Sequence, residues 1–127
     1  MKTAYIAGKY RGTSKYRIIN KCQVALNIFK AYKVGREVAK LGIFPVIPHC
    51  NTAFMGNIQP AEFWLNGTLD LMCRASDLVL LIPGWGRSEG AVGEARQAGK
   101  MLALPVYCWP SDKERLIELS TSKKGAL

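Results

Sequence analysis

Four short runs of apolar residues alternate along the chain with longer segments in which apolar positions recur at helical spacing. The runs contain many β-branched or aromatic residues and cover Thr3 to Ala7, Phe44 to Ile47, Leu78 to Ile82 and Leu104 to Cys108. Short apolar runs of this composition are typical of buried strands. Because a helical pattern separates each run from the next, the alternation predicts a parallel sheet.

The segments between the runs predict helices. The first extends from about Asn20 to Leu41 and stops at Gly42, with lysines and arginines on its polar face. Its apolar stripe comprises Val24, Ile28, Ala31, Val38 and Leu41. The second starts at Pro60 and continues to Arg74, and the third runs from Ser88 to about Lys100. The fourth follows Pro110, with Ser111 or Asp112 as its N-cap.

These elements predict a single α/β domain of the flavodoxin or Rossmann-like type, with a parallel sheet of four to five strands flanked by helices. We assign residues 1–120 to the domain and expect residues 121–127 to form a flexible basic tail. In such domains ligands bind outside the carboxyl ends of the strands. The loops that follow the strands should therefore share one edge. Asp77 precedes a strand, so we expect it at the opposite end in a structural role.

The net charge and the cysteine content indicate which ligands and partners the protein can have. Lys and Arg total 18 against 9 acidic residues, which gives a net charge of +9 and favours an acidic partner such as a nucleotide. Nucleic acid is a weaker candidate, since no recognised nucleic-acid-binding motif is present. The scattered cysteines and the single histidine argue against a zinc site, so we expect reduced thiols, no metal and no cofactor. No segment resembles a signal peptide or a membrane span, and we expect a cytoplasmic protein without a membrane partner.

The segment from Ser88 to Glu94 carries the strongest candidate chemistry. It follows a predicted strand and the turn Pro83-Gly84-Trp85-Gly86, and it opens a predicted helix. Ser88 and Gly90 leave backbone N–H groups free at the helix start, where the helix dipole favours a bound phosphate. The dipole also keeps Glu94 ionised, and a carboxylate in that position can attack an anomeric carbon. Alternatively, Glu94 only complements the helix terminus.

The loop after the first strand is the second candidate. It comprises Gly8, Lys9, Tyr10, Arg11 and Gly12. Its glycines allow close backbone approach to an anion and its cations supply charge, although a flexible turn with solvated charges would have the same composition. The glycine spacing fits neither a dinucleotide-binding fingerprint nor a Walker loop. Nicotinamide dinucleotides and ATP hydrolysis are therefore disfavoured.

His49 lies in the loop after the second strand. At this edge the imidazole either orients or protonates a substrate, or hydrogen-bonds a neighbouring loop. The sequence does not decide between these roles. A nucleophilic pair with Cys50 is unattractive, because adjacent side chains on an extended segment point apart.

Taken together, these loops resemble the nucleoside 2-deoxyribosyltransferase-like superfamily, which includes deoxynucleoside monophosphate N-glycosidases and small phage and bacterial proteins. The resemblance covers most of the chain and rests on Tyr5-Ile6-Ala7-Gly8 through Arg11-Gly12, Pro48-His49, Ser76-Asp77 with the following strand, Ser88-x-Gly90-x-x-x-Glu94 and Pro105-Val106. It implies that Glu94 is the nucleophile and that Tyr5 lies beside it and the sugar. It also implies that residues 9–12, Ser88 and Gly90 hold phosphate or polar groups of the substrate. Lys9 replaces a small hydroxyl residue of the glycosidases.

The family also has a second carboxylate, on the helix before the third strand, that assists the departing base or the sugar hydroxyl. The matching register in this chain falls on Leu69, and Asp70 is one residue away. A shift of one residue rotates a helical side chain by about 100°. Asp70 therefore serves as the catalytic carboxylate only if the helix is shifted or the alignment contains a gap. Asn66 and Glu62 are weaker substitutes.

Aromatic residues offer a wall for a nucleobase, which needs an apolar slot. Trp85 is the best placed in the sequence, Phe54 is an alternative, and Trp64 has the spacing of a core or subunit-interface residue. The resemblance implies assembly as a homodimer or larger, with which Phe63 and Trp64 are compatible.

The sequence therefore predicts an N-glycosidase or N-deoxyribosyltransferase that acts on a nucleoside or nucleoside monophosphate through a covalent Glu94 intermediate. The alternative is a nucleotide-binding domain of the same fold without catalysis.

Overall fold

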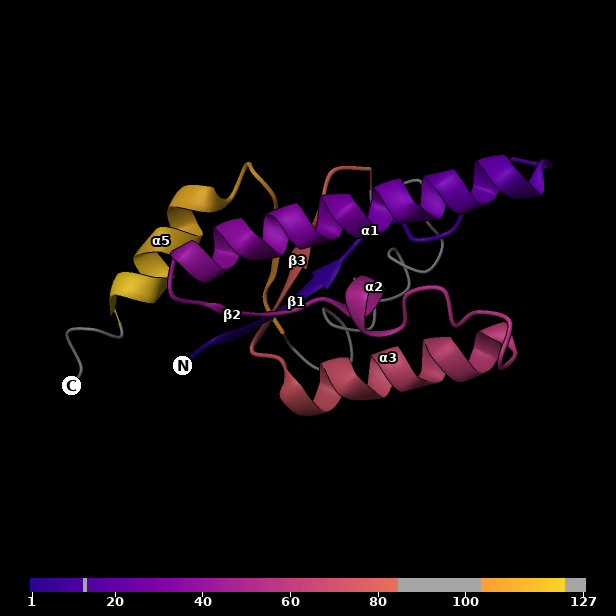
Figure 1. The fold of residues 1–127 in the computed structure, drawn as a ribbon. Helices are drawn as coiled ribbons and strands as arrows, with labels where there is room; N and C mark the ends of the chain where they lie inside the picture. The colour runs from indigo at the N-terminus through magenta and orange to yellow at the C-terminus, as the bar shows by residue number, and fades with distance from the viewer. Residues whose placement is uncertain (13, 85–103, 123–127) are drawn as a thin grey trace.

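A computed structural model of the protein describes residues 1–12, 14–84 and 104–122. In these residues four parallel strands form one sheet in the order β2-β1-β3-β4 (Figure 1). The elements are β1 (Thr3–Ala7), α1 (Arg17–Lys40), β2 (Phe44–Val46), α2 (Pro48–Asn51), α3 (Ala61–Ala75), β3 (Leu78–Leu81), β4 (Val106–Cys108) and α5 (Lys113–Ser122). The prediction of a parallel α/β domain is confirmed. The helix predicted from Ser88 to Lys100 lies outside the described residues.

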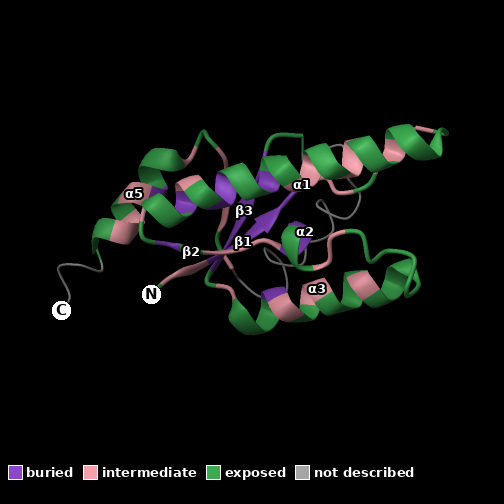
Figure 2. Cartoon of the chain, in the orientation of Figure 1, coloured by how far each residue is buried: buried purple, intermediate pink, exposed green. Residues whose placement is uncertain are grey.

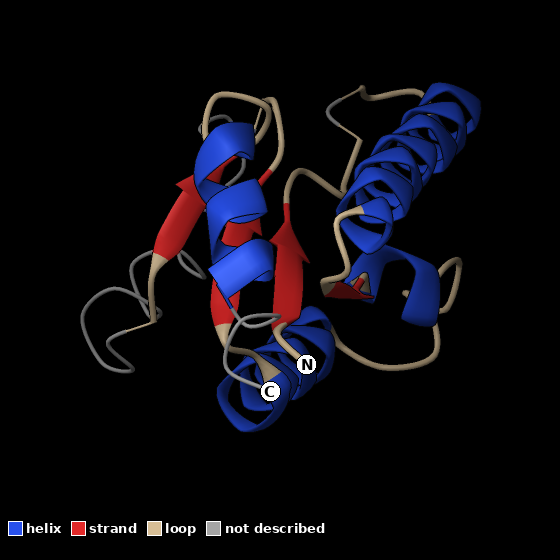
Figure 3. Cartoon of the chain, turned by 90° about the vertical axis from the view of Figure 1, so that its left-hand side faces the viewer, coloured by secondary structure: helices blue, strands red, loops and turns tan. Residues whose placement is uncertain are grey.

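Helices cover both faces of the sheet (Figure 3). Ala4 and Ile6 of β1 point toward α1 and α5, where they join a core cluster with Val38 and Leu116. Tyr5 and Ala7 point to the other face, and their cluster includes Met72 of α3. The side chains of a strand alternate between faces, so β1 serves both clusters (Figure 2). Burial on both faces explains why β1 and β3 are uninterrupted apolar runs.

Helix α1 differs from its prediction in length and in the composition of its outer face. Its 24 residues span about 36 Å, whereas the five residues of β1 span about 17 Å, so its first half extends past the sheet (Figure 1). The second half is buried through Ala31, Val34, Gly35 and Val38. On the outer face, which was predicted to be basic, Ile18, Leu26 and Phe29 are exposed beside the cations. The sequence predicted one apolar stripe on this helix. The structure shows a buried stripe that faces the sheet and exposed apolar residues on the opposite face.

Smaller differences occur elsewhere. Residues Pro48–Asn51, predicted as loop, form the short helix α2, which has proline at its start. Helix α5 extends through Ser122, so Thr121 and Ser122 are helical rather than part of a tail, and residues 123–127 lie outside the described residues. As predicted, Asp77 lies at the amino-terminal end of β3, where its carboxylate accepts a hydrogen bond from the Thr3 N–H at 2.7 Å.

Gly35 and Gly67 provide a test of the packing of α1. A Cβ atom at Gly35 would lie 2.3 Å from Cδ1 of Ile47, whereas a Cβ at Gly67 on α3 would have no neighbour within 4 Å. Alanine normally stabilises a helix relative to glycine, so G67A should raise the free energy of unfolding by about 0.5–1 kcal/mol. G35A should lower it by about 1 kcal/mol or more, because Ile47 must move. Chemical denaturation measures both changes, and equal stabilisation by the two substitutions would contradict the packing.

Candidate functional site

The loops that follow β1, β2 and β3 meet at the carboxyl edge of the sheet. We call Gly8–Gly12 the β1 loop. The Nε2–H group of His49, in α2 after β2, donates a hydrogen bond to the Lys9 carbonyl at 3.0 Å. On the other side, Gly8 packs against Ile82, which directly follows β3. The β1 loop therefore contacts both neighbouring loops, as the parallel topology requires.

Both glycines of the β1 loop are explained by packing. A Cβ atom at Gly8 would lie 2.3 Å from Cγ1 of Ile82, and one at Gly12 would lie 2.8 Å from the Asn20 Cα atom of α1. Any side chain at these positions would push the loop away from β3 or from α1. The glycines are thus explained by packing within the protein, and the close approach of an anion stays a prediction.

Tyr10 anchors the middle of the β1 loop through three contacts. Its ring meets the His49 ring edge-on, with centroids 5.5 Å apart. Its hydroxyl accepts a hydrogen bond from the Phe54 N–H at 3.2 Å, and its carbonyl accepts one from Asn27 Nδ2 at 3.2 Å. Asn27 was missed by the sequence analysis. Its signal was a polar residue between Val24 and Ile28 on the inward face of α1.

His49 is buried, with 5% of its surface exposed. Burial lowers the pKa of its imidazole from the usual 6.5, against the opposing effect of the Lys9 and Gly8 carbonyls. Because Nε2 donates to Lys9, the neutral ring carries its proton on Nε2, and Nδ1 has no hydrogen-bond partner among the described residues. Of the two roles left open by the sequence, the structure shows the hydrogen bond to a neighbouring loop.

The cations of the β1 loop are not paired with carboxylates in the described part of the chain, where the ion pairs are Lys40–Glu37, Arg74–Asp70 and Arg115–Asp112. Lys9 is half-buried and Arg11 is exposed. Both cations lie at the edge where the fold places a ligand.

Tyr5 does not lie on this edge. It is fully buried inside β1, in the cluster with Ala7, Met72, Val79 and Leu81. Its side chain faces the same side of the sheet as α3. A role beside the sugar would require the substrate to reach into this side of the domain.

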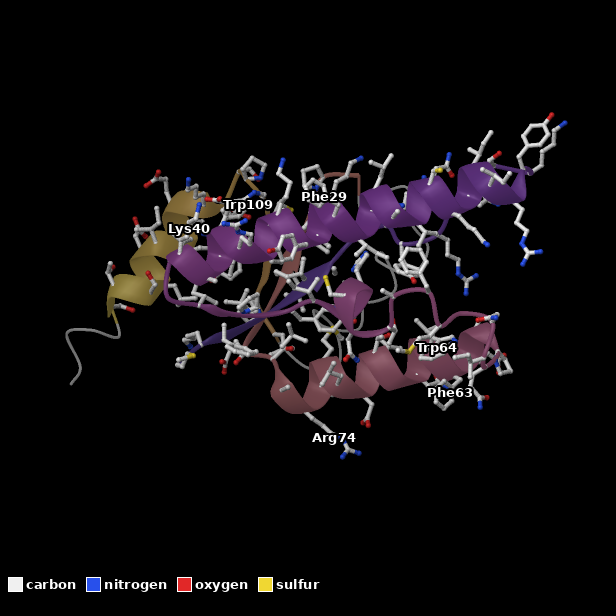
Figure 4. The ribbon with its side chains drawn as sticks, viewed as in Figure 1. Phe29, Lys40, Phe63, Trp64, Arg74 and Trp109 are labelled. Atoms are coloured by element: carbon white, nitrogen blue, oxygen red, sulfur yellow. The ribbon has the colours of Figure 1, made fainter. Side chains whose placement is uncertain are left out.

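The structure separates Asp70 from the buried cluster around Tyr5. Leu69, on which the register of the family's second carboxylate falls, packs against that cluster. Asp70 is exposed, and its Oδ1 accepts a hydrogen bond from Arg74 Nε at 3.0 Å. Figure 4 shows Arg74 pointing away from the sheet. The described contacts thus do not bring Asp70 to the carboxyl edge.

The last predicted site residues are those of the segment after β3 and the aromatic residue Trp64. Trp85, Ser88, Gly90 and Glu94 lie outside the described residues. Trp64 is half-buried, its Nε1–H group donates to the Gln59 carbonyl at 3.2 Å, and its ring meets the Phe63 ring edge-on. Within residues 1–12, 14–84 and 104–122, no group of three His, Cys, Asp or Glu side chains is suited to a metal ion.

The four cysteines are free, and Cys22, Cys50 and Cys73 are exposed. Desolvation raises the pKa of the Cys50 thiol, which opposes formation of a thiolate beside His49. No helix in the described part of the chain is long and apolar enough to cross a membrane.

Comparison with protein-family models gave no match, and comparisons with curated proteins and with solved structures gave none either. The site must therefore be interpreted from its own residues.

His49 predicts a pH dependence of stability. The chain has one histidine, and its pKa is lower in the folded state than the usual 6.5, so the unfolded chain binds the proton more readily. The stabilisation is fully present above the unfolded pKa and is lost as the pH falls from about 7 to 5. Denaturation at several pH values should show this loss in the wild type and a flatter profile in H49Q, which keeps an N–H donor.

E37Q is the control for this measurement. The pKa of Glu37 is lowered from 4.5, chiefly by its hydrogen bond to Lys40, so its titration lies below the window in question. E37Q should retain the wild-type slope between about pH 7 and 5. A wild-type slope in H49Q would show that another group causes the effect.

Proposed function

We propose that the protein is an N-glycosidase or N-deoxyribosyltransferase related to the nucleoside 2-deoxyribosyltransferase-like superfamily. The observation that carries the proposal is the meeting of the β1 loop with α2 and Ile82 at one edge, with Lys9 and Arg11 unpaired in the described part of the chain. The chain continues from β3 into the segment Ser88-x-Gly90-x-x-x-Glu94. A nucleoside monophosphate supplies both the anion and the anomeric carbon that these residues suit, and a nucleoside supplies the anomeric carbon alone.

In the proposed reaction, the Glu94 carboxylate attacks the anomeric carbon while the bond to the base nitrogen breaks. The base leaves with the bonding electron pair and takes a proton from water, and the sugar remains as a glycosyl ester of Glu94. Water then hydrolyses the ester, or a second base displaces Glu94 and regenerates an N-glycosidic bond. Lys9, Arg11 and the N–H groups near Ser88 and Gly90 would bind the phosphate. The reaction requires no cofactor.

Glu94→Gln tests the nucleophile. The amide preserves size and removes the attacking charge, so base release should fall on the order of a thousandfold or more. Chromatography of released base, with a panel of ribo- and deoxyribonucleosides and their monophosphates, measures the rate. Circular dichroism establishes that the variant is folded.

Asp70→Asn is the companion variant in this assay. Because Asp70 is exposed and bound to Arg74, its substitution should leave base release nearly unchanged. Base release that survives Glu94→Gln would refute the assignment of the nucleophile. A large loss in Asp70→Asn would instead identify Asp70 as the second carboxylate.

A nucleotide-binding domain without turnover is the second candidate. It is favoured by the packing of Leu69 against the buried cluster and the exposure of Asp70, which would leave the departing base without the carboxylate that the family uses. Tight binding of a nucleotide that stays intact over long incubation would support this candidate over the enzyme.

We also propose that the protein self-associates in the cytoplasm, where nucleotides are abundant and thiols stay reduced. Phe63 is 54% exposed and meets Trp64 edge-on, which gives α3 an apolar surface suited to a second copy. Sedimentation velocity should show a dimer or larger species, and Phe63→Ser should shift the population toward monomer. A monomer in the unsubstituted protein would contradict self-association.

A further inference from the structure

Phe54 has an unusual backbone for a bulky residue. Its φ is 59°, which makes it the only non-glycine residue with positive φ in the described part of the chain. In this left-handed conformation the Cβ atom crowds the carbonyl oxygen, so a phenylalanine adopts it only where other contacts hold it. The ring is 64% exposed and thus gains little from burial. The Met55 N–H donates to the Thr52 carbonyl at 3.2 Å, which closes a turn with Phe54 at its third position. Turns of this kind take a positive φ there and favour glycine or asparagine, so the turn explains the backbone but not the choice of an exposed phenylalanine.

The contact that holds Phe54 comes from the β1 loop. The Tyr10 hydroxyl accepts the hydrogen bond of the Phe54 N–H at 3.2 Å, across 44 residues of sequence. Tyr10 is in turn held by the His49 ring and by Asn27. The position of Phe54 is therefore set by the loop that carries Lys9 and Arg11.

Tyr10 thus connects two parts of the molecule. Its backbone belongs to the proposed phosphate-binding loop, and its hydroxyl fixes the segment of Phe54. In a mononucleotide the phosphate and the base are attached to the same sugar, so a site for it needs an anion cradle and an apolar surface at a fixed separation. The Tyr10 side chain links the backbone of Phe54 to that loop through one hydrogen bond.

Two other described aromatic residues, Trp64 and Phe29, have contacts away from the β1 loop. The Trp64 N–H donates to Gln59, and its ring contacts Phe63. Phe29 lies on the outer face of α1, where Lys33 contacts its ring at 5.6 Å from the centroid (Figure 4). Phe54 alone among them is tied directly to the β1 loop.

We infer that Phe54 is the surface on which the base of the substrate stacks, and that Tyr10 is the positioning residue that sets it relative to the bound phosphate. The inference rests on the proposed function and adds a base-binding residue to it. Stacking on an aromatic face contacts every base, so Phe54 contributes affinity for a base without selecting among bases.

The test compares a ligand with a base and one without. Calorimetric titrations with a 2′-deoxynucleoside monophosphate and with 2-deoxyribose 5-phosphate are made in a Glu94→Gln background, which keeps the nucleotide intact. Phe54→Ala should weaken the nucleotide on the order of tenfold and leave the sugar phosphate unchanged. Phe54→Trp should restore nucleotide affinity. Phe29→Ala, which removes a comparably exposed ring, should change neither.

Tyr10→Phe tests the positioning role, because it keeps the ring on His49 and removes the hydroxyl. It should weaken the nucleotide but not the sugar phosphate, and its combination with Phe54→Ala should weaken the nucleotide no further than Phe54→Ala alone.

If Phe54→Ala weakens the binding of both ligands equally, or changes the affinity of neither, the inference is overturned and the proposed function stands. Additive effects of the two substitutions would overturn the role of Tyr10. Failure of the unsubstituted protein to bind either ligand would overturn the proposed function and the inference together.

Discussion

Parallel pairing of β1 with both β2 and β3 is the constraint on which the rest of the structure depends. The pairing runs from Thr3 with Phe44 on one side and from Ala4 with Leu78 on the other. It places three strand ends at one edge of the sheet, so residues distant in sequence become neighbours there. It also buries β1 on both faces, which links the cluster beneath α1 to the cluster above α3. The β1 loop is thus fixed from three directions, by α1, α2 and the segment after β3.

β1 and β3 were predictable because burial on both faces leaves a simple signal, and the partly buried β2 and β4 because each lies in a short apolar run. A strand covered on two sides has no polar alternation, and the short apolar runs of this chain contain each of the four strands. The outer face of α1 was not predictable in the same way. Apolar residues at positions 18, 26 and 29 fall opposite the buried stripe, and spacing alone does not state how far a helix extends beyond its sheet.

Within the site, sequence order was enough to place Gly8, Lys9 and His49 at one edge, since each follows a strand. The partners of these residues were not accessible from the sequence. The bond from His49 to Lys9 spans 40 positions and the bond from Phe54 to Tyr10 spans 44, and both depend on how the loops approach after the sheet has formed. Asp70 illustrates the same limit, because one residue along α3 separates a half-buried leucine from an exposed, paired carboxylate.

The contact between Gly8 and Ile82 has an evolutionary consequence. A methyl group at position 8 would occupy the space of the Ile82 side chain, so position 8 cannot enlarge while isoleucine keeps this side-chain conformation at position 82. In related sequences, a larger residue at position 8 should accompany a smaller one at position 82. Because position 82 also begins the passage from β3 toward Glu94, drift in the first loop would be transmitted to the region of the proposed nucleophile. The two loops would then diverge as one unit.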